Sequence, residues 1–230
     1  MNAVHSNRKL SPNHMVKIPV IYGGMQAIEW CVEENIPICA TEVFSIAQIV
    51  DMCEMYEKAA ERSENPQPFF VTHITGIFDD SLQRFSKPTG VEIGPEVLSQ
   101  AGCAVARKEY RLIKERGYRT VMLGGGVRPL YHFTEFVGGD VHITINWKDA
   151  DALMRQDGPV VSRIDAETTQ AVIDELCDKF EVFRQAYHDD GLKREEYVDY
   201  GPVQLFRNDF LMGWYTLLAE VSKRRNALAI

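Results

Sequence analysis

The sequence predicts an α/β protein with parallel strands. Between residue 15 and Trp147, short apolar segments alternate with longer segments whose apolar residues recur at helical spacing. The short segments are apolar along nearly their whole length, which is typical of parallel strands covered on both faces. A chain of 230 residues is also long enough to enclose one sizeable core. We therefore expect a single domain at 15–230, preceded by a polar lead-in at 1–14.

The first strand and helix are bounded by residues that end regular structure. An apolar run at 15–20 predicts a strand, and Pro19 indicates its end. Gly23 and Gly24 then open a helix, which Asn35 terminates. This strand and helix form the first repeat of the alternation.

The next two strands are rich in apolar and β-branched residues. The second strand is expected at 36–44, and Ser45 is a natural cap for a helix at 46–60. A third strand is expected at 69–74. The polar stretch at 79–94 contains a proline and two glycines, so we expect a loop that exposes its two aspartates.

The later part of the chain contains two more strands and several helices. The strands are expected at 119–123 and 141–145, and the alternation stops after Trp147. Helices are expected at 96–116, 130–137, 165–187 and 206–224. The last of these helices carries a stripe predicted to face the core, formed by Phe206, Phe210, Trp214, Leu217 and Leu218.

Composition excludes several functional classes. The net charge of −8 gives no electrostatic footprint for nucleic acid or an anionic membrane. We find no signal peptide and no membrane-spanning segment, so we expect a cytoplasmic protein. Neither the five cysteines nor the histidines show metal-ligand spacing, so we expect reduced thiols and no bound metal.

Lys17 is the most informative residue of the first strand. It lies between Val16 and Ile18, and lysine is rarely buried without a functional reason. Burial would lower the pKa of the amine and make it a nucleophile. The alternative is a lysine at a strand end that extends its amine to solvent. The local pattern alone favours this alternative, although Lys17 remains a candidate nucleophile.

Hydroxyl groups and a glycine-rich turn supply further candidates. Thr41 and Thr72 lie in the next two strands, where they could orient a water molecule or a substrate hydroxyl. Their alternative role is ordinary strand formation, in which threonine is common. The glycines at 124–126 precede Arg128 at a predicted helix start, an arrangement that suits an anion. A purely structural turn explains these glycines equally well.

Four segments together resemble the transaldolase family. They are VKIP at 16–19, TEVFSIAQ at 41–48, THITG at 72–76 and RTVMLGGGVRP at 119–129. The first two are the most specific, because in that family a KIP-type strand carries the Schiff-base lysine. The next strand of the family carries a threonine three residues before an FS-x-x-Q helix start, and Thr41 has this spacing.

The resemblance implies a TIM (β/α)8 barrel and a class I aldolase mechanism without a cofactor. Lys17 would attack the ketone of a ketose phosphate, release an aldehyde, and transfer the remaining dihydroxyacetone unit to an acceptor sugar. Such an enzyme would serve carbohydrate metabolism of the pentose phosphate type. Thr41 would hold the catalytic water and Thr72 would face the substrate. Gly126 and Arg128 would lie where the family binds phosphate.

The sequence departs from the family at the phosphate end of the site. Ile77 stands where the family has a second arginine, and Gly126 replaces a serine. Cys39 replaces an asparagine two residues before the threonine. Arg128 alone makes a weaker phosphate clamp, since several donors normally fix a dianion. A substrate without phosphate is therefore an open alternative.

The resemblance also implies that about five of the eight strands are present. The lysine strand is the fourth of the family's barrel, and residues 1–14 are too few to supply three more strands. We therefore expect an N-terminally truncated barrel, completed by a homo-oligomer or by another chain. Two alternatives stay open: an aldolase of the same family that releases the three-carbon unit, and an inactive remnant or binding module.

Overall fold

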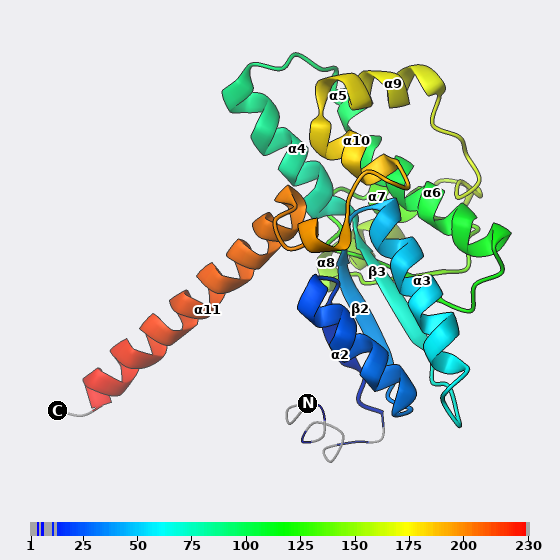
Figure 1. Cartoon of the computed structure of the whole chain (residues 1–230). Helices are drawn as coiled ribbons and strands as arrows, with labels where there is room; N and C mark the ends of the chain where they lie inside the picture. Colours follow the sequence, from blue (N-terminus) through cyan, green and yellow to red (C-terminus); the bar gives the residue numbers. More distant parts are fainter. Residues whose placement is uncertain (1–3, 5, 7–10, 12, 229–230) are drawn as a thin grey trace.

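The computed structural model describes residues 4, 6, 11 and 13–228. Most of the predicted lead-in at 1–14 lies outside this part of the chain. The centre of the fold is one sheet of five parallel strands in the order β1-β2-β3-β4-β5 (Figure 1). The strands are β1 (Val16–Pro19), β2 (Ile38–Val43), β3 (Phe69–Ile74), β4 (Val121–Gly125) and β5 (Val141–Ile143). The predicted α/β class with parallel strands is confirmed.

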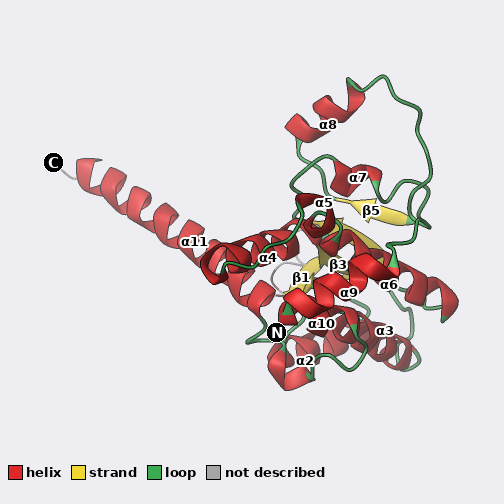
Figure 2. Cartoon of the chain, turned by 90° about the horizontal axis from the view of Figure 1, so that it is seen from above, coloured by secondary structure: helices red, strands yellow, loops and turns green. Residues whose placement is uncertain are grey.

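Helices connect consecutive strands and continue after the last one (Figures 1 and 2). The helices between the strands are α2 (Tyr22–Glu33), α3 (Ile46–Ala60), α4 (Thr75–Thr89), α5 (Pro95–Leu98), α6 (Ala101–Glu115) and α7 (Tyr131–Thr134). The later ones are α8 (Trp147–Met154), α9 (Gln170–Lys179), α10 (Glu181–Tyr187), the 3-10 turn η1 (Arg194–Glu196) and α11 (Gly201–Leu228).

The two faces of the sheet differ in burial. The strand register aligns Ala40, Val71 and Met122 on one face, where all three are buried in the main core. The same register aligns Lys17 with Cys39 on the opposite face, because successive strand residues point to alternate sides. Lys17 is exposed there. Of the functional candidates on the strands, Lys17 is thus accessible, whereas Thr41 and Thr72 are buried.

The predicted loop at 79–94 is wrong, because most of it belongs to helix α4. Ile77, Phe78 and Leu82 are buried at helical spacing beneath the polar residues that suggested a loop. Pro88 lies in the last turn, and Gly90 ends the helix with a left-handed backbone, φ 68°. The amphipathic spacing was therefore a better guide than the overall polarity.

Other helices also differ from the sequence prediction. The helix expected at 96–116 is divided into α5 and α6. The helix expected at 165–187 begins later and is interrupted at Phe180, whose backbone is extended. The sequence prediction also missed α8, which Asn146 caps by accepting a hydrogen bond from the backbone N–H of Asp149.

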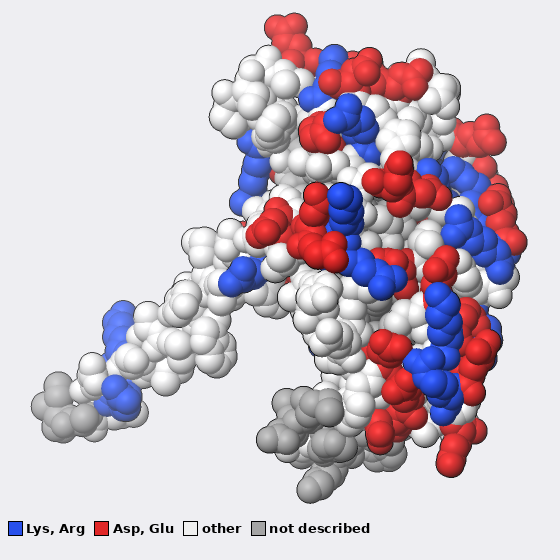
Figure 3. All heavy atoms as spheres, viewed as in Figure 1, with Lys and Arg blue, Asp and Glu red and all other residues white. Residues whose placement is uncertain are grey.

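Helix α11 leaves the body of the molecule after its first turns (Figure 1). Pro202 and Val203 are buried, but the described residues from 207 onward are exposed. Phe206 packs against the core, but the rest of the predicted core-facing stripe is wrong, since Phe210 is 63% exposed and Trp214 is 56% exposed. The segment 210–219 contains no charged residue, and Figure 3 shows few charged side chains along the projecting length of α11.

A buried ionisable pair joins the sheet to helix α6. The Nδ1 atom of His73 lies 3.0 Å from Oε1 of Glu109, and both side chains are fully buried. Burial raises the pKa of Glu109, and the nearby imidazole only partly offsets this effect. The other carboxylate oxygen of Glu109 has no hydrogen-bond partner among the described residues. Ionisation of Glu109 is therefore less favourable in the folded chain than in the unfolded chain.

We predict that Glu109 makes the protein less stable as pH rises. A raised carboxyl pKa in the folded state means that the folded chain binds more protons above about pH 4.3, the ordinary pKa of glutamate. The free energy of unfolding should therefore fall with pH more steeply in the wild type than in Glu109→Gln. Urea unfolding between pH 4 and 8 measures both slopes, and equal slopes would contradict the prediction.

Candidate active site

The structure brings Lys17, Thr41 and Thr72 to one face of neighbouring strands. Lys17 pairs with Cys39 in the register of β1 and β2, and Pro19 pairs with Thr41. The sulfur of Cys39 lies 3.1 Å from the hydroxyl oxygen of Thr72. Lys17 is exposed, so the expected burial of its amine is not found in the described chain. The Lys17 side chain is therefore accessible from solvent.

Thr41 is buried, and its hydroxyl has no hydrogen-bond partner among the described residues. A buried hydroxyl of this kind can accept or donate a bond to a bound water or substrate. The register between β2 and β3 shifts between Ala40 and Val43, so β2 is irregular beside Thr41. Glu42 has a left-handed backbone, φ 63°, which is uncommon for residues other than glycine. Such irregular backbone is often found at functional sites.

Glu42 is a further candidate site residue that the sequence prediction missed. Burial raises the pKa of its carboxyl group, and the positive charges of Lys17 and Arg207 lower it in part. A carboxyl group near the candidate nucleophile can carry a proton to or from it. No local pattern marks Glu42, because its left-handed backbone and the charge of Arg207 on helix α11 become apparent only in the folded chain.

Gln48 holds the carboxyl ends of β1 and β2 together. Its buried amide nitrogen donates to the carbonyl oxygens of Val20 and Glu42, each at 3.0 Å. Its amide oxygen accepts from the backbone N–H of Phe44 and from the hydroxyl of Ser45. These contacts fix the segments that follow Lys17 and Thr41. Gln48 therefore sets the relative position of the two strands that carry the catalytic candidates.

Arg128 and Gly126 lie at the carboxyl end of β4. Gly126 has a positive φ of 58°, and a Cβ atom there would lie 2.4 Å from a methyl carbon of Ile74. Arg128 is half-exposed, and its Nε atom lies 3.2 Å from the carboxylate of Asp80. The predicted anion-binding arginine thus already has an acidic partner. Asp80 was expected to be solvated in a loop, and this ion pair was not foreseen.

The backbone of Arg128 is held by a separate series of hydrogen bonds that leads into the interior. Its N–H donates to Nδ1 of His132 at 3.3 Å, and Nε2 of His132 lies 2.8 Å from Asp79. The other oxygen of Asp79 accepts from the N–H of Gly102 at 2.8 Å. Burial raises the pKa of Asp79, although these hydrogen bonds oppose the shift. The expectation that Asp79 is solvated is therefore wrong.

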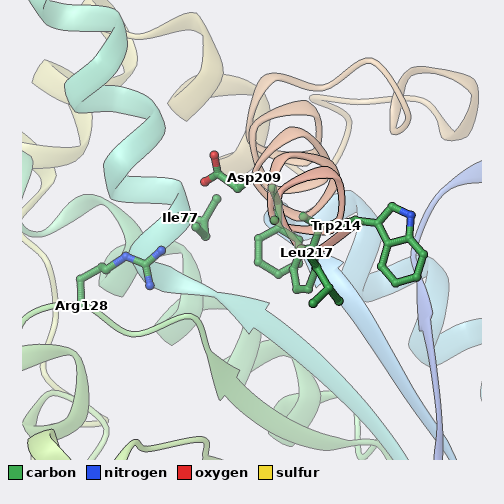
Figure 4. A pocket seen from close by; sticks show the side chains of 8 residues that line it. Ile77, Arg128, Asp209, Trp214 and Leu217 are labelled. Carbon is green, nitrogen blue, oxygen red and sulfur yellow. The ribbon is translucent and has the colours of Figure 1, made fainter. Parts of the chain in front are cut away.

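A cavity of about 490 Å³ lies beside Arg128 (Figure 4). It is bounded by the start of α4, by Arg128 and by one side of α11. Its lining is formed by Ile77, Arg128, Phe206, Asp209, Phe210, Gly213, Trp214 and Leu217. The cavity therefore lies between the predicted substrate-binding arginine and the apolar part of α11.

One protein family matches most of the chain. The family model described as Transaldolase/Fructose-6-phosphate aldolase matches residues 2–200. The chain belongs to this family. The family adopts the TIM-barrel fold that the sequence prediction named, and five of its parallel strands are described here.

Several transaldolases are similar to the chain at low identity. The transaldolase of Mycobacterium leprae (strain Br4923) is 29% identical over 140 residues, covering 54% of this chain and 36% of the relative. That of Mycobacterium tuberculosis (strain CDC 1551 / Oshkosh) is 27% identical over 151 residues, covering 58% and 39%. That of Prochlorococcus marinus (strain MED4) is 26% identical over 188 residues, covering 79% and 50%. The chain thus spans half or less of the length of these relatives.

No group of three or more histidine, cysteine, aspartate or glutamate side chains in the described part of the chain is arranged to hold a metal ion. None of the helices in that part combines the length and the apolar character that crossing a membrane requires.

Proposed function

We propose that the chain acts as a transaldolase-type enzyme in which Lys17 forms a Schiff base with a ketose. The observation that carries this proposal is the shared face of Lys17, Thr41 and Thr72 in a chain of this family. The amine nitrogen of Lys17 attacks the ketone carbon, and the carbonyl oxygen leaves as water. The resulting iminium withdraws electrons while the sugar carbon chain is cleaved and an aldehyde departs.

Neighbouring residues would then handle water and protons. The buried hydroxyl of Thr41 is free to bind the water that enters or leaves the iminium carbon. Glu42 would exchange a proton with that water; the support for this role is the positive charge of Lys17, which acts on its carboxyl group and lowers its pKa in part. Thr72 would face the sugar hydroxyls from β3. The three-carbon unit on Lys17 then passes to an acceptor sugar, or to water in the aldolase variant.

We predict that borohydride with dihydroxyacetone labels Lys17. Hydride adds to the iminium carbon and leaves a stable secondary amine, which peptide mass spectrometry locates. Lys17→Ala should abolish the label, whereas the control Lys148→Ala removes another exposed amine and should leave the label intact. The proposed mechanism would be contradicted if the label lies on other lysines and persists unchanged in Lys17→Ala. A second incubation with an acceptor aldose distinguishes transfer from release to water.

A second candidate is a chain that catalyses only together with another polypeptide. The observation that favours it is the sheet order, in which β1 and β5 each pair with a single neighbour among the described strands. An unpaired edge can accept a further strand. A second copy or a different barrel-completing chain would then be needed for turnover. Sedimentation analysis tests this candidate, since a monomer that is labelled at Lys17 and turns over substrate would contradict it.

A further inference from the structure

The cavity beside Arg128 is poor in positive charge. Among the described residues that line it, Arg128 is the only cation and Asp209 is the only anion. The guanidinium of Arg128 already contacts Asp80 at 3.2 Å. Arg84 is 3.9 Å from Asp209, but it does not line the cavity. A dianion would therefore meet one engaged guanidinium and two nearby carboxylates, an arrangement that disfavours phosphate.

The rest of the lining is apolar. Ile77 lines the cavity from the start of α4, and Trp214 and Leu217 project from α11 (Figure 4). Phe210 of α11 also lines the cavity. These three side chains of α11 are more than half exposed, so a ligand that covers them removes apolar surface from water. The lining matches a ligand with a hydrocarbon or aromatic end. A neutral hydroxyl on such a ligand can still accept from Arg128 without displacing Asp80.

We propose that this cavity binds the uncharged, apolar end of an aldehyde or deoxy sugar, and that it discriminates against a terminal phosphate. That the ligand is a substrate rests on the proposed function, whereas the preference for an uncharged end follows from the lining itself. The preference is set by the ion pair of Arg128 with Asp80 and by the apolar side of α11.

Two small alcohols without a carbonyl group test the preference by binding alone. Pentane-1,2-diol and glycerol 3-phosphate share a diol end and differ in an apolar or phosphorylated end. Trp214 lines the cavity and reports occupancy by its fluorescence, and the signal is assigned by its absence in Trp214→Phe. We expect the wild type to bind the pentanediol at least about tenfold more tightly than the phosphate.

A pair of aspartate variants tests the cause of the preference. Asp80→Asn should strengthen binding of glycerol 3-phosphate about tenfold, because Arg128 is released from its carboxylate. Asp151→Asn is the matched control, since it also removes a surface carboxylate from an arginine pair. It should change neither affinity. An unchanged phosphate affinity in Asp80→Asn would show that the ion pair does not set the preference.

The remaining outcomes separate this inference from the proposed function. Tighter binding of the phosphate than of the pentanediol, or no Trp214 response to either, overturns the inference. Neither probe can form an iminium, so Lys17→Ala should keep the same affinity ratio. A preserved ratio together with failed borohydride labelling of Lys17 would leave the cavity preference standing and refute the Schiff-base mechanism.

Discussion

Replacing Gly76 by alanine is expected to destabilise the protein by about 3 kcal/mol or more, because the added methyl group has no space. A Cβ atom at Gly76 would lie 2.1 Å from the carbonyl oxygen of Gly126 and 2.7 Å from Cγ of Arg128. The first contact is with backbone, so the turn after β4 would have to move. The change should therefore also disturb the position of Arg128.

Gly23 provides a matched control for this prediction. Both glycines are the second residue of a helix, but a Cβ atom at Gly23 meets nothing within 4 Å. Gly23→Ala should be stabilising by about 0.5 kcal/mol, because alanine favours the helix more than glycine does. Urea unfolding of both variants measures the difference. Similar stabilities for Gly76→Ala and Gly23→Ala would show that the turn yields without cost.

Replacing Gln48 by alanine is expected to cost roughly 3 to 5 kcal/mol, because several buried polar groups lose their partner together. The carbonyls of Val20 and Glu42 and the N–H of Phe44 are all bonded by this one amide. Gln48→Glu should also be destabilising, since it keeps the shape but places a carboxylate against two carbonyl oxygens. Thermal and urea unfolding measure both losses.

Gln83 provides the control for Gln48, because it lies exposed on α4. Gln83→Ala should change the free energy of unfolding by less than about 0.5 kcal/mol. The borohydride label adds a functional readout, because a loosened β1 and β2 should reduce labelling of Lys17 even where the variant remains folded. A Gln48→Ala variant with wild-type stability and labelling would show that the contacts of Gln48 are dispensable.

The elements that could be predicted from sequence depend on local spacing. The helix at 46–60 and the strand at 69–74 were predicted with the bounds that the structure has. The predicted cap at Ser45 is also confirmed, since its side chain accepts from the N–H of Gln48. Each of these signals lies within a few residues along the chain, where capping and periodicity act.

The features that could not be predicted depend on contacts between distant segments. The pairing of Asp79 with His132 joins residues 53 positions apart, and that of His73 with Glu109 joins residues 36 positions apart. Neither residue type nor local polarity indicates such a partner. The position of α11 was missed for a related reason, because a stripe of apolar residues predicts burial but does not specify the surface that buries it.

The two attachments of Arg128 have a consequence for how the specificity of this pocket can be altered. Its backbone is fixed through His132 and Asp79 in the interior, whereas its side chain contacts Asp80 at the surface and donates a long hydrogen bond to the carbonyl oxygen of Gly126. The backbone position of the turn and the charge that Arg128 presents to a ligand thus depend on different contacts. One surface substitution can therefore change which ligands bind without moving the backbone that positions Arg128. Ligand selectivity can thus be redesigned with little loss of stability.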